Sequence, residues 1–262
     1  MVKVGFIGAG NMALALIKAI KKAGLASSVY ASDIKEDRLR IAKEEAKVNV
    51  TPYNKVVLNE SDIIFLAVKP QDIDTALDGM KNTDKLIISI AAGITLKHLE
   101  SRLKNARVIR VMPNAPCLVG EMAAGFAVGS KVKDEDIKIV EELLNSAGRA
   151  FLLKESMLDA VTGLSGSGPA FIAYLIKCLA EAGVKQGLSR DISAELAERT
   201  ALGTAKLLIE KGLSADELIK MVASPGGTTI AGLDVLAKSD VKHVLIKTVE
   251  KAAKRSKELG KR

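Results

Sequence analysis

The sequence predicts an α/β protein in which an N-terminal, Rossmann-type doubly wound parallel sheet is followed by an all-helical dimerisation domain. Two observations support this fold class. Short apolar runs alternate with amphipathic segments up to residue 154, which is typical of βαβ units. After Glu155 only helical spacing of apolar residues remains. We therefore expect two domains, residues 1–154 and residues 155–262.

In the first domain, strand-like and helix-like segments follow one another. Strands are expected at Lys3–Ile7, Val29–Ser32, Asp62–Val68, Leu86–Ile90, Val108–Met112, Ala124–Val128 and Arg149–Leu153. Helices are expected at Met12–Ala23, Lys35–Ala46, Ile73–Met80, Leu96–Leu103 and Glu135–Ala147. This alternation predicts parallel pairing through right-handed crossovers.

The second domain is expected to contain helices at Phe171–Lys185, Ile192–Ile209, Ala215–Val222, Ile230–Ala237 and Val241–Leu259. One stretch, Ala194–Leu208, carries apolar or small residues around most of its circumference. A helix of this kind is buried, and so small a domain offers too little protein to bury it. The pattern predicts a homodimer formed through the helical domain.

The composition restricts the class of protein. Hydrophobic residues make up 48% of the chain, which excludes a disordered protein. The apolar runs are too short to cross a bilayer, and no secretory signal is expected after Met1. The two cysteines, Cys117 and Cys178, fit a reducing compartment. These features predict a cytoplasmic protein without membrane contact.

The net charge of +8 raises the question of nucleic-acid binding. The basic residues are scattered apart from a cluster in residues 251–262, and no aromatic residues lie among them to stack on bases. A solvated helix end that complements the helix dipole explains this cluster better. We expect no nucleic-acid partner. The alternative predicts salt-sensitive binding that disappears when residues 251–262 are deleted.

The turn Gly8-Ala-Gly-Asn-Met-Ala13 has the pattern G-x-G-x-x-A, directly after the first strand and at the start of the first helix. Gly8 permits a tight turn, and Gly10 lets a pyrophosphate approach the backbone. The small side chain of Ala13 allows close packing of helix and strand. In an alternating α/β chain this pattern predicts a dinucleotide site.

The end of the second strand bears on the choice of nicotinamide cofactor. Asp33, after Ser32, is placed to bind ribose hydroxyls and to repel a 2′-phosphate, whereas Lys35 and Arg38 are placed to neutralise that phosphate. Asp33 is equally suited to cap the following helix. The choice between NADPH and NADH stays open.

Three further turns follow strands of the expected sheet: Ala67–Pro70, Ala91–Thr95 and Met112–Asn114. Ligands of doubly wound sheets bind at the carboxyl edge of the strands, where these turns are expected. We therefore place all three on the rim of the cofactor site, although Pro70 and Pro113 also suit a structural role as strand ends.

The segment Ala223-Ser-Pro-Gly-Gly-Thr-Thr-Ile230 is typical of a helix start, with Ser224 as the cap and Pro225 in the first helical position. Its glycines leave the backbone N–H groups of residues 226–229 open. Such groups attract a small anion such as a carboxylate. We expect the substrate to bind here.

Few residues are suited to acid–base or covalent catalysis. The two histidines, His98 and His243, stand outside any metal-ligand cluster, and no nucleophile motif is present, so no metal site is expected. Hydride transfer needs none of these groups, because a nicotinamide carries the chemistry. Hydroxyacid and sugar-acid dehydrogenases resemble this chain in layout, but they have a Lys where Ile172 stands, which favours an imine substrate here.

Two stretches of the helical domain are distinctive: Asp159-Ala-Val-Thr-Gly-Leu-Ser-Gly-Ser-Gly-Pro-Ala170 and Ser224–Ile230. Together with Gly5–Met12, Ala67–Pro70 and Arg110–Asn114, they resemble the motifs of the pyrroline-5-carboxylate reductase family, in order and over essentially the whole chain. The resemblance implies reduction of 1-pyrroline-5-carboxylate to L-proline with NADPH or NADH, the last step of proline synthesis.

The resemblance also implies a cofactor site, with the pyrophosphate at Ile7–Met12 and the nicotinamide beside Ala91–Gly93. Joined with the residues at the end of the second strand, the expected cofactor-binding residues are Ile7, Gly8, Ala9, Gly10, Asn11, Met12, Ser32, Asp33, Lys35, Asn54, Ala67, Val68, Lys69, Pro70, Ala91, Ala92 and Gly93.

By the same resemblance, Gly227, Thr228 and Thr229 bind the substrate, and the catalytic contact is the Thr229 hydroxyl on the ring nitrogen. Glu155 matches a substrate-side Glu of some members and is equally suited to be an exposed turn residue. Members form dimers through swapped helical domains and often larger rings. The Thr228–Thr229 helix would then serve the cofactor of the partner subunit.

Two positions depart from the family. Asp33 stands where NADPH-using members commonly have Ser, Asn or Thr, and Met221 replaces a polar residue, so no role is carried over to it. Two alternative functions remain: a reductase of a related cyclic imino acid with a six-membered ring, and a cofactor-binding regulator without catalysis.

Overall fold

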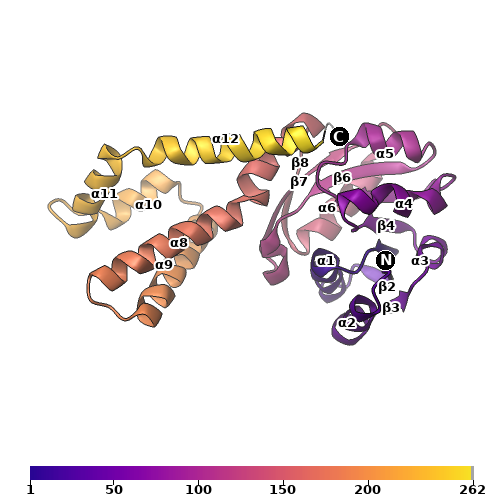
Figure 1. Ribbon diagram of the computed structural model, residues 1–262, viewed down its shortest axis with the longest axis horizontal. Helices are drawn as coiled ribbons and strands as arrows, with labels where there is room; N and C mark the ends of the chain where they lie inside the picture. Colours follow the sequence, from indigo (N-terminus) through magenta and orange to yellow (C-terminus); the bar gives the residue numbers. More distant parts are fainter. Residues whose placement is uncertain (261–262) are drawn as a thin grey trace. The chain divides into compact units, whose positions relative to one another are not determined.

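The computed structural model describes residues 1–260, which form two compact units (Figure 1). Among the described residues, unit 1 comprises Met1–Ser167 and residues 250–260, and unit 2 comprises Gly168–Val249. Lys261 and Arg262 of the expected basic cluster lie outside the described residues. No described helix is both long and apolar enough to span a membrane.

Unit 1 is built on an eight-stranded sheet with the strand order β3-β2-β1-β4-β5-β6-β7-β8. Its strands are β1 (Val2–Ile7), β2 (Ala26–Ser32), β3 (Asn49–Thr51), β4 (Ile63–Leu66), β5 (Leu86–Ser89), β6 (Arg107–Met112), β7 (Met122–Val128) and β8 (Gly148–Leu152). Strands β2 and β3 lie on one side of β1, and β4 then pairs with β1 on its other side. This reversal marks the crevice in which doubly wound sheets bind ligands.

The expected all-parallel pairing is wrong at one position, because β7 runs antiparallel to β6. Between Met112 and Met122 the chain forms only the short 3₁₀ helix η3 (Ala115–Val119). A parallel connection needs a crossover of about a dozen residues or more. This segment is too short for one, so the strand direction reverses.

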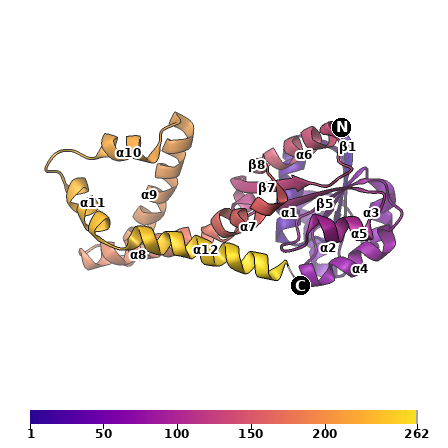
Figure 2. The same cartoon turned by 90° about the horizontal axis from the view of Figure 1, so that it is seen from above.

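Helices cover both faces of the sheet. They are α1 (Asn11–Lys22), α2 (Glu36–Ala46), α3 (Asn54–Glu60), α4 (Ile73–Leu77), α5 (Leu96–Arg102), α6 (Asp134–Asn145) and α7 (Leu158–Val161), with short turns η1 (Pro70–Asp72), η2 (Asp78–Met80), η4 (Glu155–Met157) and the π-helical η5 (Thr162–Gly166). Buried residues of α1, α2 and α6 share one core, and those of α3, α4 and α5 share the other. Both views show α4 and α5 side by side (Figure 1, Figure 2).

Unit 2 contains α8 (Gly168–Lys185), α9 (Arg190–Lys211), α10 (Ala215–Val222), α11 (Thr228–Lys238) and the first part of α12 (Val241–Leu259). Helices α8 and α9 pack against each other. Within residues 168–249 the only buried hydrophobic side chains are Ala197 and Leu218. Unit 2 therefore has almost no core of its own, as expected of a helical domain that needs a second copy.

The end of α12 belongs to unit 1, where it packs on α7. The hydroxyl of Ser256 donates a hydrogen bond of 2.7 Å to Oδ1 of Asp159, and Ser256 is buried. Leu158, also on α7, is fully buried in the core of unit 1. For these reasons the compact units divide at Ser167, later than the expected boundary after residue 154, and that boundary stays a prediction.

Candidate active site

A cavity of about 600 Å³ opens where β1, β2 and β4 end, at the reversal of the strand order. The expected cofactor residues that line it are Ile7, Gly8, Gly10, Asn11, Met12, Ser32, Asp33, Lys35, Asn54, Ala67, Val68 and Lys69. Ala13, Arg38, Met112 and Pro113, which the sequence placed near the same site, also line it. The structure thus brings residues from five separate strand ends and from the start of α3 to one cavity.

Several lining residues were missed by the sequence analysis: Ile34, Gln71, Asp72, Thr75, Ala76 and Ile90. Most of them directly follow a rim turn, because η1 and α4 begin where the Ala67–Pro70 turn ends. Their position just beyond the carboxyl end of β4 is the signal that could have identified them.

The glycine-rich turn has the geometry of a phosphate cradle. Gly8 has φ +99°, and a Cβ built on it would lie 2.5 Å from the carbonyl oxygen of Ala67. A Cβ built on Gly10 would meet only Nη1 of Arg38, at 3.9 Å, so the space above the start of α1 is open. No side chain caps α1, which leaves its first backbone N–H groups available. A pyrophosphate fits this cradle.

Asp33 does not cap α2, because the residue at the N-cap position is Lys35. The carboxylate instead accepts hydrogen bonds from the backbone N–H groups of Ala9, at 2.8 Å, and Lys35, at 2.9 Å. Next to it, Ser32 donates a hydrogen bond of 2.7 Å to Oδ1 of Asn54. Asn54 is therefore tied to the end of β2.

The remaining expected cofactor residues, Ala9, Pro70, Ala91, Ala92 and Gly93, do not line the cavity. Ala91 is buried, and Gly93 adopts φ +78°. A Cβ built on Gly93 would lie 3.6 Å from the backbone carbon of Leu259, so the end of α12 lies against this turn. The turn nevertheless follows Ile90, which does line the cavity.

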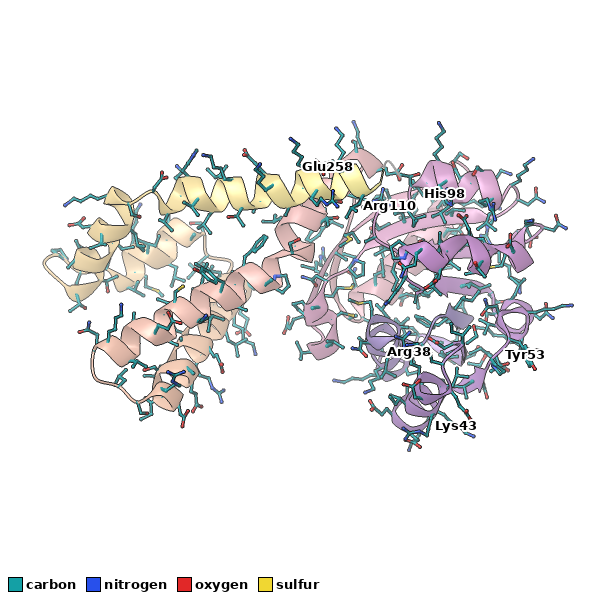
Figure 3. The ribbon with its side chains drawn as sticks, in the orientation of Figure 1. Arg38, Lys43, Tyr53, His98, Arg110 and Glu258 are labelled. Carbon is teal, nitrogen blue, oxygen red and sulfur yellow. The ribbon has the colours of Figure 1, made fainter. Side chains whose placement is uncertain are left out.

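Glu155 is not a solvent-exposed turn residue. Its Oε1 accepts hydrogen bonds from Nη1 of Arg110, at 2.9 Å, and from the backbone N–H of Leu96, at 2.7 Å. The Arg110 side chain is only 8% exposed, whereas that of Glu155 is 32% exposed. Figure 3 labels Arg110, which lies on β6. The ion pair joins η4, β6 and the start of α5.

In unit 2 the helix cap expected at Ser224 is wrong by three residues, and the helix expected from Ile230 begins two residues earlier. Helix α11 begins at Thr228, with Gly227 rather than Ser224 at the N-cap position. The residues before it form a turn in which the N–H of Gly227 donates to the carbonyl of Ser224, at 2.9 Å. Pro225 followed by Gly226 at φ +70° is the pattern of a type II turn. The N–H of Gly227 is therefore occupied, whereas those of Thr228 and Thr229 remain open.

The other reactive side chains offer no competing site. Burial raises the pKa of the Cys117 thiol to about 11, so the thiol stays protonated at neutral pH and is a poor nucleophile. His98, labelled in Figure 3, lies on α5. Its Nε2 lies 2.9 Å from Oδ1 of Asp74 on the surface. Within residues 1–260 no group of three or more His, Cys, Asp or Glu could hold a metal ion.

Comparison with known proteins matches both parts of the chain to families. Residues 155–259 match the family described as pyrroline-5-carboxylate reductase dimerisation. Residues 3–93 match the family described as NADP oxidoreductase, coenzyme F420-dependent. A pyrroline-5-carboxylate reductase from Methanosarcina acetivorans is 43% identical, over 99% of this chain and 98% of that protein.

Two solved structures are similar to this chain over nearly its full length. The pyrroline-5-carboxylate reductase of Coxiella burnetii is 32% identical with a TM-score of 0.93, covering 98% of both chains. The pyrroline carboxylate reductase of Plasmodium falciparum, with NADP bound, is 32% identical with a TM-score of 0.85, covering 99% of this chain and 98% of that one.

Proposed function

The chain belongs to the pyrroline-5-carboxylate reductase family, and we propose that unit 1 binds the nicotinamide cofactor while α11 of unit 2 binds the substrate. The enzyme reduces 1-pyrroline-5-carboxylate to L-proline with NAD(P)H, the last step of proline biosynthesis. The relatives are named for the five-membered ring, so the alternative with a six-membered ring is not favoured.

The open glycine-rich turn is the observation that carries the cofactor assignment. The first N–H groups of α1, beside Gly10, would hold the pyrophosphate, and Asn54 with the Ala67–Pro70 turn would hold the nucleotide. The Ala91–Gly93 turn directly follows Ile90, which lines the same cavity. This position supports placing the nicotinamide end of the cofactor beside the turn. When bound, the nicotinamide supplies the hydride.

The substrate carboxylate would bind the open N–H groups of Thr228 and Thr229 in the first turn of α11, where the helix dipole favours an anion. Gly227 must lack a side chain, since a Cβ there would lie 2.4 Å from Oγ of Ser224. The Thr229 hydroxyl would donate to the ring nitrogen, and Glu155 would contribute its second oxygen on the substrate side. These residues act by holding and orienting the imine rather than by moving protons.

The enzyme is a homo-oligomer, and we propose a dimer formed through the helical domain, residues 155–262. The scarcity of buried hydrophobic residues in unit 2 supports this arrangement. In such a dimer, the first turn of α11 would complete the active site of the partner subunit, and dimers would assemble into a ring. We further propose a cytoplasmic location, which suits two cysteines that form no disulfide.

The direct test is oxidation of NADPH and of NADH, followed at 340 nm with 1-pyrroline-5-carboxylate and with the six-membered homologue. We expect proline as the product and a higher kcat/KM for the five-membered ring. A higher kcat/KM for the six-membered ring would contradict the proposed substrate. Cofactor binding without turnover of either substrate would contradict the proposed activity.

Replacing Thr229 tests the residue assigned to the ring nitrogen. We expect Thr229→Val, which keeps the shape but loses the hydroxyl, to lower kcat/KM about tenfold, since one hydrogen bond contributes about 1.5 kcal/mol. The matched variant Thr229→Ser keeps the donor and should retain most of the activity. Equal activity of the two variants would exclude a role for the hydroxyl.

A further inference from the structure

The carboxylate of Asp33 is held almost entirely by the protein. Its Oδ2 accepts from the N–H of Ala9 at 2.8 Å and lies 3.4 Å from Nη1 of Arg38, and its Oδ1 accepts from the N–H of Lys35 at 2.9 Å. A carboxylate offers about four acceptor positions, so three of them are occupied. The Asp33 side chain is 5% exposed.

An acidic residue that selects NADH accepts a hydrogen bond from the 2′-hydroxyl of the adenosine ribose. The Asp33 carboxylate is poorly placed for this contact, because its side chain is 5% exposed and only one of its about four acceptor positions is free. Its contacts instead join the glycine-rich turn at Ala9 to the start of α2 at Lys35. Asp33 is therefore a structural residue of the cavity floor.

The two basic residues beside Asp33, Arg38 and Lys35, are more exposed and have free hydrogen-bond donors. Arg38 is 37% exposed, and its guanidinium has five N–H donors, of which one makes the long contact with Asp33. Lys35 is exposed, and within residues 1–260 its ammonium has no carboxylate partner within 4.0 Å. Both residues line the cavity, and Arg38, labelled in Figure 3, lies within reach of Gly10.

We propose that this enzyme prefers NADPH, and that Arg38, assisted by Lys35, determines the preference by binding the 2′-phosphate of the adenosine ribose. The proposal rests on the cofactor site proposed above. A guanidinium binds phosphate through two parallel hydrogen bonds, whereas an ammonium acts as a point charge. Arg38 therefore contributes more than Lys35. The charge of Asp33 is already offset by two N–H groups and by Arg38, so it does not exclude the phosphate.

The test compares two fragments of the cofactor, 2′,5′-ADP and 5′-AMP, which differ only in the 2′-phosphate. Their binding to the full-length enzyme is measured by isothermal titration calorimetry without substrate. We expect 2′,5′-ADP to bind at least about tenfold more tightly, since charge-assisted hydrogen bonds are gained. Equal affinities, or tighter binding of 5′-AMP, would overturn the preference. No binding of either fragment would instead contradict the proposed cofactor site.

Arg38→Ala should weaken 2′,5′-ADP about tenfold or more and leave 5′-AMP nearly unchanged, with a smaller effect for Lys35→Ala. Arg40→Ala is the matched control, because Arg40 lies on the same helix but pairs with Glu44 outside the cavity. The ratio of kcat/KM for NADPH to that for NADH should fall in Arg38→Ala, fall less in Lys35→Ala, and stay unchanged in Arg40→Ala. Equal weakening of both fragments would contradict a role in discrimination.

Asp33→Asn separates the two possible roles of this carboxylate. As a structural residue it should weaken both fragments by a similar factor, because an amide cannot accept from both Ala9 and Lys35 through its two ends. If Asp33 selected NADH by repelling the phosphate, the variant would bind 2′,5′-ADP more tightly than the wild type does. That result would overturn the assignment, and thermal melting checks that the variant is folded.

Discussion

At the scale of single residues, Glu155 has two oxygens with different surroundings. Oε1 accepts from both Arg110 and Leu96, whereas Oε2 has no protein donor among the described residues. The same side chain can therefore neutralise a buried guanidinium and still have an acceptor left for the substrate role proposed above. The two roles are separable, since they use different atoms.

Replacing Glu155 should show both roles. We expect Glu155→Ala to lower the free energy of unfolding by about 2 kcal/mol, since Arg110 is left buried without a partner. Glu155→Gln keeps an oxygen for Arg110 and Leu96 and should cost less than half as much. Chemical denaturation gives both values, and the KM for substrate in the Gln variant reports on Oε2.

Glu121→Ala is a suitable control, because Glu121 is an exposed carboxylate of unit 1 for which the structure records no ion pair in residues 1–260. A Glu155→Ala variant as stable as this control would exclude the structural role. An unchanged KM for the substrate in Glu155→Gln would contradict the proposed contact between Glu155 and the substrate.

The role of a residue could be predicted from the sequence where a motif fixes the backbone conformation. It could not be predicted where a side chain has several hydrogen-bond partners within reach. Gly8 and Gly10 lie where their spacing placed them: Gly8 has a positive φ and no room for a Cβ, and the space beside Gly10 is open to a ligand. For Asp33 the sequence offered a ribose contact or a helix cap. The structure shows a third arrangement, which depends on Ala9, 24 residues away, and therefore leaves no local signal.

At the scale of the elements, a lysine caps a helix that the sequence did not predict. Lys85, just before β5, donates from its ammonium to the carbonyl of Ser61, at 2.6 Å, and to that of Leu58. These carbonyls lie at the end of α3, where a positive charge also complements the helix dipole.

Removing this cap should destabilise unit 1. We expect Lys85→Met, which keeps the aliphatic stem, to lower the free energy of unfolding by about 1.5 kcal/mol. Lys55→Met is the matched control, since Lys55 is an exposed lysine of α3. Urea denaturation of both variants checks the difference. Equal stability would show that the carbonyls are satisfied by water.

Elements with a strong hydrophobic period could be predicted, and short ones could not. The strands β1, β2, β4, β5, β6, β7 and β8 lie within a few residues of their expected positions, and α10 and α12 have the expected bounds. β3 and α3 were missed because they are short and are held by neighbours, β3 by β2 and α3 through Lys85. The start of α11 was wrong because Ser-Pro-Gly-Gly suits a turn as well as a cap.

At the scale of the whole molecule, unit 2 exposes many apolar side chains. On α8 and α9 these include Leu179, which is 58% exposed, and Leu202, which is 50% exposed. A single chain cannot bury them within residues 168–249, whose helices have almost no buried hydrophobic residues. The homo-oligomer is expected to cover this surface.

A charge placed on that surface should prevent assembly. We expect Leu179→Asp and Leu202→Asp to reduce the mass measured by sedimentation equilibrium and to lower the melting temperature. Val119→Asp is the control, because Val119 is 76% exposed but belongs to unit 1. If both helical variants kept the wild-type mass, the interface would lie elsewhere.

The return of α12 to unit 1 has a consequence for the order of folding during synthesis. The hydrogen bond from Ser256 joins residues 97 positions apart, and all of unit 2 is translated between them. At about 5–20 residues per second, the ribosome needs roughly 5–20 s to make that stretch. Through that interval the nascent sheet has its strands but lacks the helical turn that covers Gly93. The nucleotide-binding unit, although encoded first, is therefore completed last.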